Sequence, residues 1–209
     1  MTHVPTPSAP TDQTAYAERY SNVAIALHWS IAALVLTTLP LGLFGAANDN
    51  PAGQMATDIH KPIGILILAL TLVRIGWRLT HRPPPLSDAY ATHLKWIARV
   101  AHVLFYVLLL LLPLSGWWMS SAVPIERHPI NFAGLEIPFL PVPRGWPSAG
   151  PARMMHGNMG WLMIGLVVLH VLAALRHQFI DKDNILARMT PPAVSGKFSN
   201  LLKTPNRDS

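Results

Sequence analysis

Three long stretches of the chain carry no charged side chain. They cover residues 20–48, 100–125 and 154–175. Each is at least as long as the roughly 20 apolar residues that a helix needs to cross a bilayer. Only 12% of all residues are charged, about half the share that is usual in a soluble domain. Because a backbone in lipid must satisfy its own hydrogen bonds, these stretches predict membrane-spanning helices.

A fourth span is expected after Lys61. Residues 63–73 are almost wholly apolar, although Arg74 and Arg78 follow them. Long arginine side chains near a helix end can reach the headgroup layer while their stems stay in hydrocarbon. The sequence therefore predicts an all-α fold, an integral membrane four-helix bundle of up-down topology. The expected helices cover residues 22–46, 59–79, 94–122 and 152–179.

Basic residues divide unequally between the two sides of this bundle. Of the 16 Lys and Arg residues, only four lie on the side of the first and third connections: Lys61, Arg127, Arg144 and Arg153. The positive-inside rule therefore predicts that both termini are cytoplasmic. The net charge of +6 is typical of an anchor to anionic lipid. A nucleic-acid role is not expected, because no basic helix face lies outside the spans.

The remaining segments are expected to be tails and connections. Residues 1–18 predict a flexible cytoplasmic tail, residues 19–189 the membrane domain, and residues 190–209 a second cytoplasmic tail. Residues 81–93 predict a short connector that begins at consecutive prolines. The segment 121–151 contains many prolines and several aromatic side chains. We expect it to fold back over the bundle as a lid.

Ten histidines are present, and four of them fall within or at the ends of the expected helices. His28 lies near the inner start of the first helix, whereas His60 and His156 lie at the outer starts of the second and fourth. His170 follows His156 by fourteen residues, which places it about 21 Å deeper and on nearly the same helix face. Depth therefore predicts an inner pair of His28 and His170. The outer pair is then His60 and His156.

Two imidazoles at each level suit a haem iron. A porphyrin supplies four nitrogens, so two histidines complete six-coordination, and neither level offers a Cys, Asp or Glu at a spacing that would complete a zinc site. The chain has no cysteine, which excludes iron–sulfur clusters and covalent c-type attachment. We therefore predict two noncovalent haem b groups. The residue four positions after each histidine is small: Ala32, Gly64, Gly160 and Ala174.

An alternative reading of these histidines is structural. Small residues are common wherever membrane helices pack closely, and a histidine at a helix end can be an ordinary interfacial side chain. For His28 and His170, deeper in the apolar layer, a functional role is the default.

Other candidates are weaker. His102 and His177 are candidates for a proton relay or a quinone contact, with packing favoured for His102 and an interfacial role as the alternative for His177. Arg74 and Arg78 are candidates for pairing with haem propionates, although snorkelling to lipid phosphate is the simpler account. The remaining histidines are expected in loops: His3, His81, His93 and His128.

The chain resembles the bacterial di-haem cytochrome b561 proteins of the inner membrane, over roughly residues 20–189. The resemblance rests on short segments in a fixed order. They are Arg19-Tyr20, His28-Trp29, His60 to Gly64, Arg74, Trp77-Arg78, Ala101-His102, Tyr106, Pro113 to Trp117, His170 to His177, Phe179 to Asp183, Leu186 and Arg188-Met189. Pro62 departs from the Ser that is frequent there, and proline is tolerated in a first helical turn.

This resemblance places the family's four haem ligands on His28, His60, His156 and His170, in the pairing that depth predicts. It implies electron exchange between a periplasmic donor or acceptor and the quinone pool. Some members oxidise superoxide and deliver the electron to ubiquinone, so a quinone-linked oxidoreductase activity is left open. Expected partners are membrane lipid, a quinone and a redox partner that the sequence does not identify. A homodimer is also left open.

Two other function classes compete with this reading. Some relatives are cytochrome b subunits that anchor a separate dehydrogenase or hydrogenase to the membrane. A metal-ion transporter that uses the histidines as a relay is less well supported, because transport sites usually involve carboxylates inside the membrane and these spans contain none away from their ends.

Overall fold

The computed structural model describes residues 19–81, 92–123, 129–181 and 186–190. Its long helices are α1 (Asn22–Ala47), α2 (Pro51–Thr80), α3 (Thr92–Ala122) and α4 (Trp146–Arg176). All four regions are long and apolar enough to span a membrane, and only 6% to 17% of their most apolar windows is buried inside the protein. Such extensive exposed apolar surface requires a lipid surrounding. The predicted all-α membrane bundle is confirmed.

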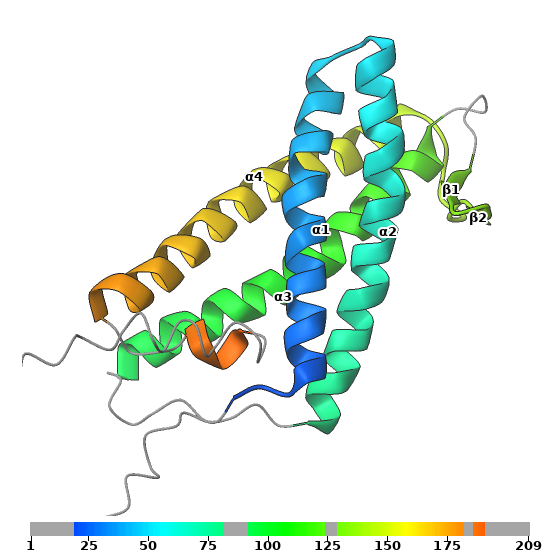
Figure 1. Ribbon diagram of the computed structural model, residues 1–209. Coiled ribbons are helices and arrows are strands. Elements are labelled where there is room, and N and C mark those ends of the chain that lie inside the picture. The colour runs from blue at the N-terminus through cyan, green and yellow to red at the C-terminus, as the bar shows by residue number, and fades with distance from the viewer. Residues whose placement is uncertain (1–18, 82–91, 124–128, 182–185, 191–209) are drawn as a thin grey trace, which may run out of the picture.

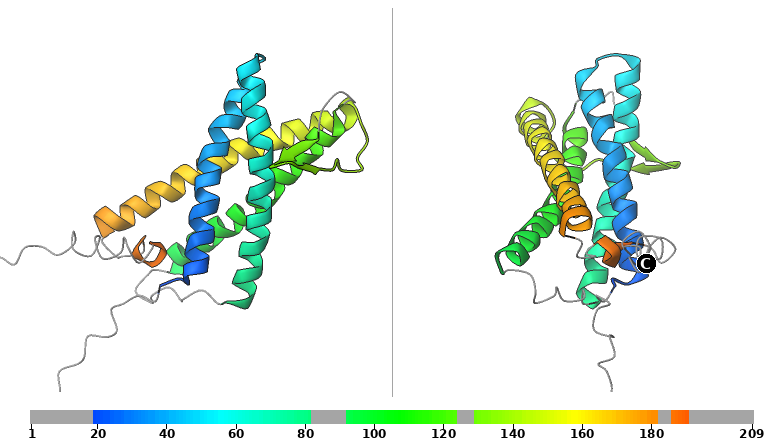
Figure 2. Two further views of the ribbon diagram at one scale, coloured as in Figure 1. Left: turned by 45° about the vertical axis from the view of Figure 1, so that its right-hand side comes forward. Right: turned by 60° about the vertical axis from the view of Figure 1, so that its left-hand side comes forward.

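The four helices form two antiparallel pairs. Helices α1 and α2 run side by side, and α3 runs antiparallel to α4 (Figure 1). The second pair crosses the first at an angle (Figure 2). Helix α2 packs against α3, whereas α1 and α4 scarcely touch. We call the end at which α1 begins and α4 finishes the terminal end. The opposite end, with the α1–α2 turn, is the loop end.

A small apolar core joins all four helices near the middle of the bundle. Met163 of α4 belongs to it and is only 2% exposed. Many leucines of the same helices are exposed instead, for example Leu36, Leu72 and Leu169. Packing of this core is therefore what holds the crossed pairs together, because lipid supplies no hydrophobic drive between helices. The core consists of Ile31, Val35, Ile67, Leu108, Leu109, Met163 and Leu166.

The described part of the segment between α3 and α4 packs beside α2 (Figure 1). A two-stranded hairpin, β1 (Ile130–Phe132) and β2 (Leu135–Ile137), lies against α2 through β1. Ser121 at the end of α3 accepts a hydrogen bond from the backbone of Leu140 (3.0 Å), and the indole of Trp117 donates to the carbonyl of Pro138 (3.0 Å). Hydrogen bonds from α3 thus fix the described part of this segment, which covers residues 129–145.

Two helices begin earlier than expected. Helix α2 starts at Pro51 and not at residue 59, because the Asn50 side chain caps the backbone of Gly53 (2.9 Å) and a proline at the first helical position needs no donor. Pro62, which we expected in a first turn, therefore lies inside α2. Helix α4 starts at Trp146 and not at residue 152, again with a proline in its first turn.

The chain continues past α4 in two short turns. Helix α4 ends at Arg176 and runs into the π-helical turn η1 (His177–Asp181), and a single 3-10 turn, η2 (Leu186–Met189), follows. The expected tail 1–18, most of the connector 81–93 and the tail beyond Thr190 lie outside the described residues.

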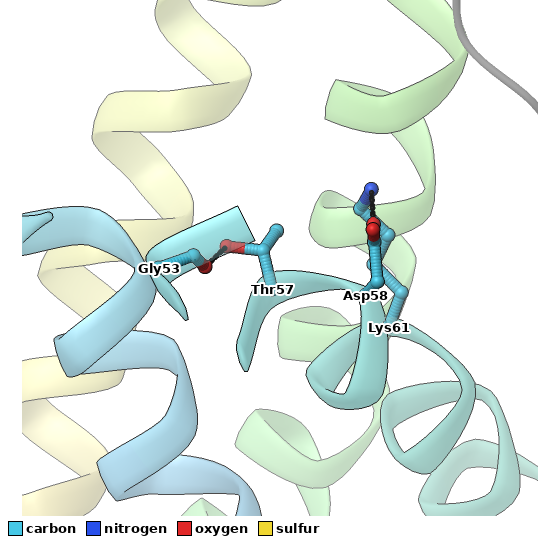
Figure 3. Close-up of polar contacts among 4 residues, drawn as sticks. All are labelled: Gly53, Thr57, Asp58 and Lys61. Atoms are coloured by element: carbon cyan, nitrogen blue, oxygen red, sulfur yellow. Dashed lines mark hydrogen bonds and ion pairs between the residues drawn. The ribbon is translucent and has the colours of Figure 1, made fainter. Parts of the chain in front are cut away.

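The α1–α2 turn leaves no room for a side chain at Gly53. A Cβ added there would collide with the carbonyl oxygen of Asn48, and one added at Gly45 would meet the hydroxyl of Thr57. The Thr57 hydroxyl in turn donates to the carbonyl of Gly53 (3.0 Å), as Figure 3 shows. Three residues can therefore connect the helices only because the backbones approach this closely.

We expect Gly53→Ala to destabilise the protein by about 1–3 kcal/mol, the usual cost of forcing an extra group into a packed site. Thermal unfolding in detergent, followed by circular dichroism, measures the change. The matched control is Gly76→Ala on the same helix, where an added Cβ meets nothing within 4 Å. Equal stability of both variants would show that the turn does not depend on Gly53.

Candidate functional site

The four predicted histidines come together in two pairs at two levels of the bundle. The rings of His60 (α2) and His156 (α4) have their centroids 6.0 Å apart, and we call them the loop-end pair. The rings of His28 (α1) and His170 (α4) have theirs 6.4 Å apart, and we call them the terminal-end pair. Helix α4 supplies one histidine to each pair, so the pairs join helices of opposite hairpins.

Both separations fit two imidazoles on opposite sides of one metal ion. A metal–nitrogen bond of about 2.0 Å, with the nitrogen about 1.2 Å from its ring centre, puts the two centroids about 6.4 Å apart. The planes of the rings are inclined by 82° in the loop-end pair and by 73° in the terminal-end pair. Within the described ranges, no three His, Cys, Asp or Glu side chains converge to hold a bare metal ion. The four predicted ligands are thus arranged in twos, as haem ligation requires.

The loop-end imidazoles are held in one tautomer. Nδ1 of His60 lies 2.9 Å from the carbonyl oxygen of Thr38, and Nδ1 of His156 lies 3.1 Å from that of Leu112. A carbonyl oxygen can only accept, so Nδ1 carries the proton in both rings. The Nε2 atom of each ring therefore keeps a free lone pair for a metal.

A side-chain hydroxyl lies within hydrogen-bond distance of Nδ1 in each of these rings. Oγ1 of Thr38 is 2.9 Å from Nδ1 of His60, and Oγ of Ser115 is 3.0 Å from Nδ1 of His156. The Ser115 hydroxyl donates to the carbonyl of Leu112 (2.7 Å), which leaves its lone pairs for the ring. Sequence reasoning overlooked both side chains. Their positions in the sequence could have indicated them: Ser115 directly precedes a glycine, and Thr38 lies one helical turn before one.

Two glycines make room for the loop-end imidazole rings. A Cβ added at Gly42 would lie 2.7 Å from Cε1 of His60, and one added at Gly116 would lie 3.1 Å from Cε1 of His156. Each ring thus packs directly on the backbone of the other helix in its own hairpin. Gly64 and Gly160, each one turn after a ligand, are different, because an added Cβ there would contact nothing within 4 Å. They leave the helix surface beside each ligand clear, as a planar macrocycle needs.

The terminal-end pair has apolar and aromatic neighbours. Phe105 lies edge-on to His170 at 5.2 Å, and Trp29 lies 5.5 Å from His28. His102 also approaches His170, at 6.0 Å, while its own Nδ1 is 2.6 Å from the carbonyl of Ala98 one turn earlier. His102 is therefore closer to the site than its sequence position suggested. The described residues give neither His28 nor His170 a side-chain hydrogen bond.

Arg74 turns into the bundle near this pair. Its Nη1 donates to the carbonyl of Ala24 (2.9 Å), one turn before His28, and its Nε donates to the hydroxyl of Tyr106 (3.2 Å). This inward position differs from the snorkelling that we expected. The guanidinium of Arg78 lies 5.6 Å from the ring centroid of Tyr106.

Turn η2 docks beside the start of α1. The indole of Trp29 donates to the carbonyl of Met189 (2.7 Å), and Arg19 donates to that of Thr190 (2.7 Å). His177 lies in the adjacent turn η1, with its Nδ1 3.4 Å from the carboxylate of Asp181. Chain segments far apart in sequence therefore meet at the terminal end, within reach of His28.

The remaining histidines are separate from both pairs. His81 stacks on Trp77 at 3.7 Å, and His93 is exposed at the start of α3. His3 and His128 lie outside the described residues.

Comparison with known proteins identifies the family. The family described as prokaryotic cytochrome b561 matches residues 19–192. Cytochrome b561 homolog 2 of Escherichia coli (strain K12) is 33% identical over 175 residues, which are 82% of this chain and 91% of the relative.

Two further relatives match almost over their full lengths. A probable superoxide oxidase CybB of Yersinia pestis is 32% identical over 83% of this chain and 97% of its own length. A cytochrome b562 of Cereibacter sphaeroides is 31% identical over 83% of this chain and 96% of its own length. With four helices that can span a membrane, the chain belongs to the prokaryotic cytochrome b561 family, multi-pass membrane proteins of transmembrane electron transfer that carry haem b.

Proposed function

We propose that this chain binds two haem b groups, one between the loop-end histidines and one between the terminal-end histidines, and exchanges electrons between a periplasmic donor or acceptor and the quinone pool. The observation that carries the proposal is the spacing of the two ring pairs, 6.0 and 6.4 Å. Each haem would supply a one-electron couple at its iron.

The histidines decide what kind of chemistry is favoured. Two imidazoles per iron fill both axial positions and leave none for oxygen, so the sites suit electron transfer. The fixed Nδ1–H tautomers of His60 and His156 present Nε2 without any rotation of the rings. Apolar core residues such as Ile67 and Met163 are buried between the levels and exclude water from the centre of the bundle.

Orientation follows from charge. Most Lys and Arg residues lie toward the terminal end, which we place at the cytoplasmic face of the bacterial inner membrane. The loop-end pair then lies near the periplasm. At the terminal end, Arg74 uses only two of its five N–H donors on Ala24 and Tyr106. The others can serve a haem propionate, and the neighbouring Arg78 is a second candidate.

We place a quinone contact at the terminal end. Helix α4 continues into turn η1, which places His177 at the terminal end, and His102 lies beside His170. Either imidazole can accept the proton that a quinol releases when it gives up its electrons. The relative named as a probable superoxide oxidase makes superoxide a candidate donor at the opposite end.

Purified protein should contain about two b haems per chain, because each histidine pair completes one six-coordinate iron. The pyridine haemochrome assay measures the number, and low-spin visible spectra report the axial ligation. His170→Ala should remove one haem and leave the loop-end one, while His156→Ala should remove the other. Retention of both haems in either variant would contradict the pairing.

Gly42→Ala should weaken haem binding at the loop end about 10- to 100-fold, the range typical when the support of a metal ligand is lost. The new Cβ would stand 2.7 Å from His60, so the ring has to move. Haem content after detergent dilution measures the loss. The matched control is Gly165→Ala, where an added Cβ meets nothing within 4 Å. An equal loss of haem in both variants would show that haem binding does not depend on the close contact between Gly42 and His60.

Superoxide generated at the loop-end face of oriented vesicles should reduce the haems, and added ubiquinone should reoxidise them. Absorbance of the reduced haems against time measures both steps. Vesicles that carry the His60→Ala variant are the control, since they lack the loop-end haem. If the intact protein accepts electrons only from a co-purifying dehydrogenase or hydrogenase, the chain acts as an anchor subunit.

A further inference from the structure

The two histidine pairs differ in how their outer nitrogens are bonded. At the loop end, each Nδ1 has two oxygen acceptors within 3.1 Å: a backbone carbonyl and the hydroxyl of Thr38 or Ser115. At the terminal end, the described residues offer neither His28 nor His170 an acceptor. A hydrogen bond from Nδ1–H makes the ring a stronger electron donor through Nε2, and stronger donation stabilises the oxidised metal.

The charges near the two pairs act in the same direction. They also favour the oxidised metal more at the loop end than at the terminal end. Arg74 binds the carbonyl of Ala24, one turn from His28, and its described partners are all uncharged. At the loop end, Lys61 follows His60 directly, but its ammonium lies 3.0 Å from the carboxylate of Asp58, as Figure 3 shows. A positive charge that no protein carboxylate offsets favours the reduced form of a nearby iron, whereas an ion pair within the protein largely cancels its own field.

Buried position makes these hydrogen bonds effective. Thr38 is 7% exposed and Ser115 is 2% exposed, so water does not compete for either hydroxyl. In a medium of low dielectric, a hydrogen bond polarises its donor more strongly than in water.

We propose that Thr38 and Ser115 are positioning residues that tune the loop-end site to a lower reduction potential than the terminal-end site. The proposal rests on the two haem pairs proposed above. Each hydroxyl acts through a histidine: Thr38 through His60 and Ser115 through His156. The two hydroxyls act on the two histidines of the same pair, so the loss of either one should change the potential of that site.

Potentiometric titration of the purified protein, followed by its visible spectrum, tests the proposal. The wild type should show two waves, and the lower one should be absent in His60→Ala. Thr38→Val keeps the side-chain shape without the hydroxyl, and Ser115→Ala removes a single oxygen atom. Each should raise the potential of the lower wave, and the double variant should raise it further. The upper wave should not move.

Two controls separate tuning from general disturbance of the helix. Thr38→Ser restores a hydroxyl and should return the lower wave to its wild-type position. Thr37→Val removes the neighbouring hydroxyl, which bonds only the carbonyl of Ala33 in its own helix, and should shift neither wave. If Thr38→Val loses the loop-end haem, Ser115→Ala decides the outcome alone.

The possible failures are distinguishable. Fewer than two waves in the wild type would overturn the haem pairs and the tuning with them. Two waves that stay in place in Ser115→Ala, or that move together, would overturn the tuning and leave the haem pairs intact. A loop-end wave above the terminal-end wave would also overturn it.

Discussion

An imidazole inside a lipid-embedded bundle has to satisfy its polar ring nitrogens without water. That constraint organises the loop end of this protein. Nδ1 of His60 is satisfied by Thr38, and Nδ1 of His156 by Leu112 and Ser115. A helical carbonyl already accepts one intrahelical bond, but it has a second lone pair, which a close neighbour can use. Such an approach is possible only where the neighbouring helix has a glycine, here Gly42 or Gly116.

Each of these supports comes from the ligand's own hairpin. His60 on α2 rests on α1, and His156 on α4 rests on α3. A hairpin can therefore orient its loop-end ligand before the two hairpins meet. Each histidine pair, in contrast, joins helices of different hairpins. Helices α1 and α4, which supply the terminal-end pair, have few direct contacts with each other. A cofactor held there adds to a core that is small for four helices of this length.

The terminal end is organised by different interactions. Side-chain donors bind backbone carbonyls: Arg74 donates to that of Ala24, and Trp29 donates to that of Met189. These contacts join the start of α1 to α2 and to turn η2. The terminal-end pair thus sits among aromatic rings and a partly buried guanidinium, whereas the loop-end pair sits among hydroxyls and carbonyls. One pair of imidazoles in each surrounding gives a single bundle two chemically distinct sites.

Much of this architecture could be predicted without coordinates. Charge-free stretches predicted three helices, and the apolar run after Lys61 predicted the fourth. The spacing of His156 and His170 on one face, with the depth of His28 and His60, predicted which histidines meet. These features follow from helix geometry and membrane thickness alone. The starts of α2 and α4 were predicted too late, because both helices extend back to a proline in the first turn. A capped helix tolerates proline in its first turn.

The sequence by itself determined the spans, the four candidate ligands and their pairing, since each depends on spacing along a helix of regular rise. Only the tertiary structure decided the tautomers of the loop-end histidines and their close contacts with Gly42 and Gly116. It also decided the inward turn of Arg74 and the docking of η2. Those features depend on how one helix is rotated and placed against its neighbour, and that placement is a balance of close packing over the whole bundle.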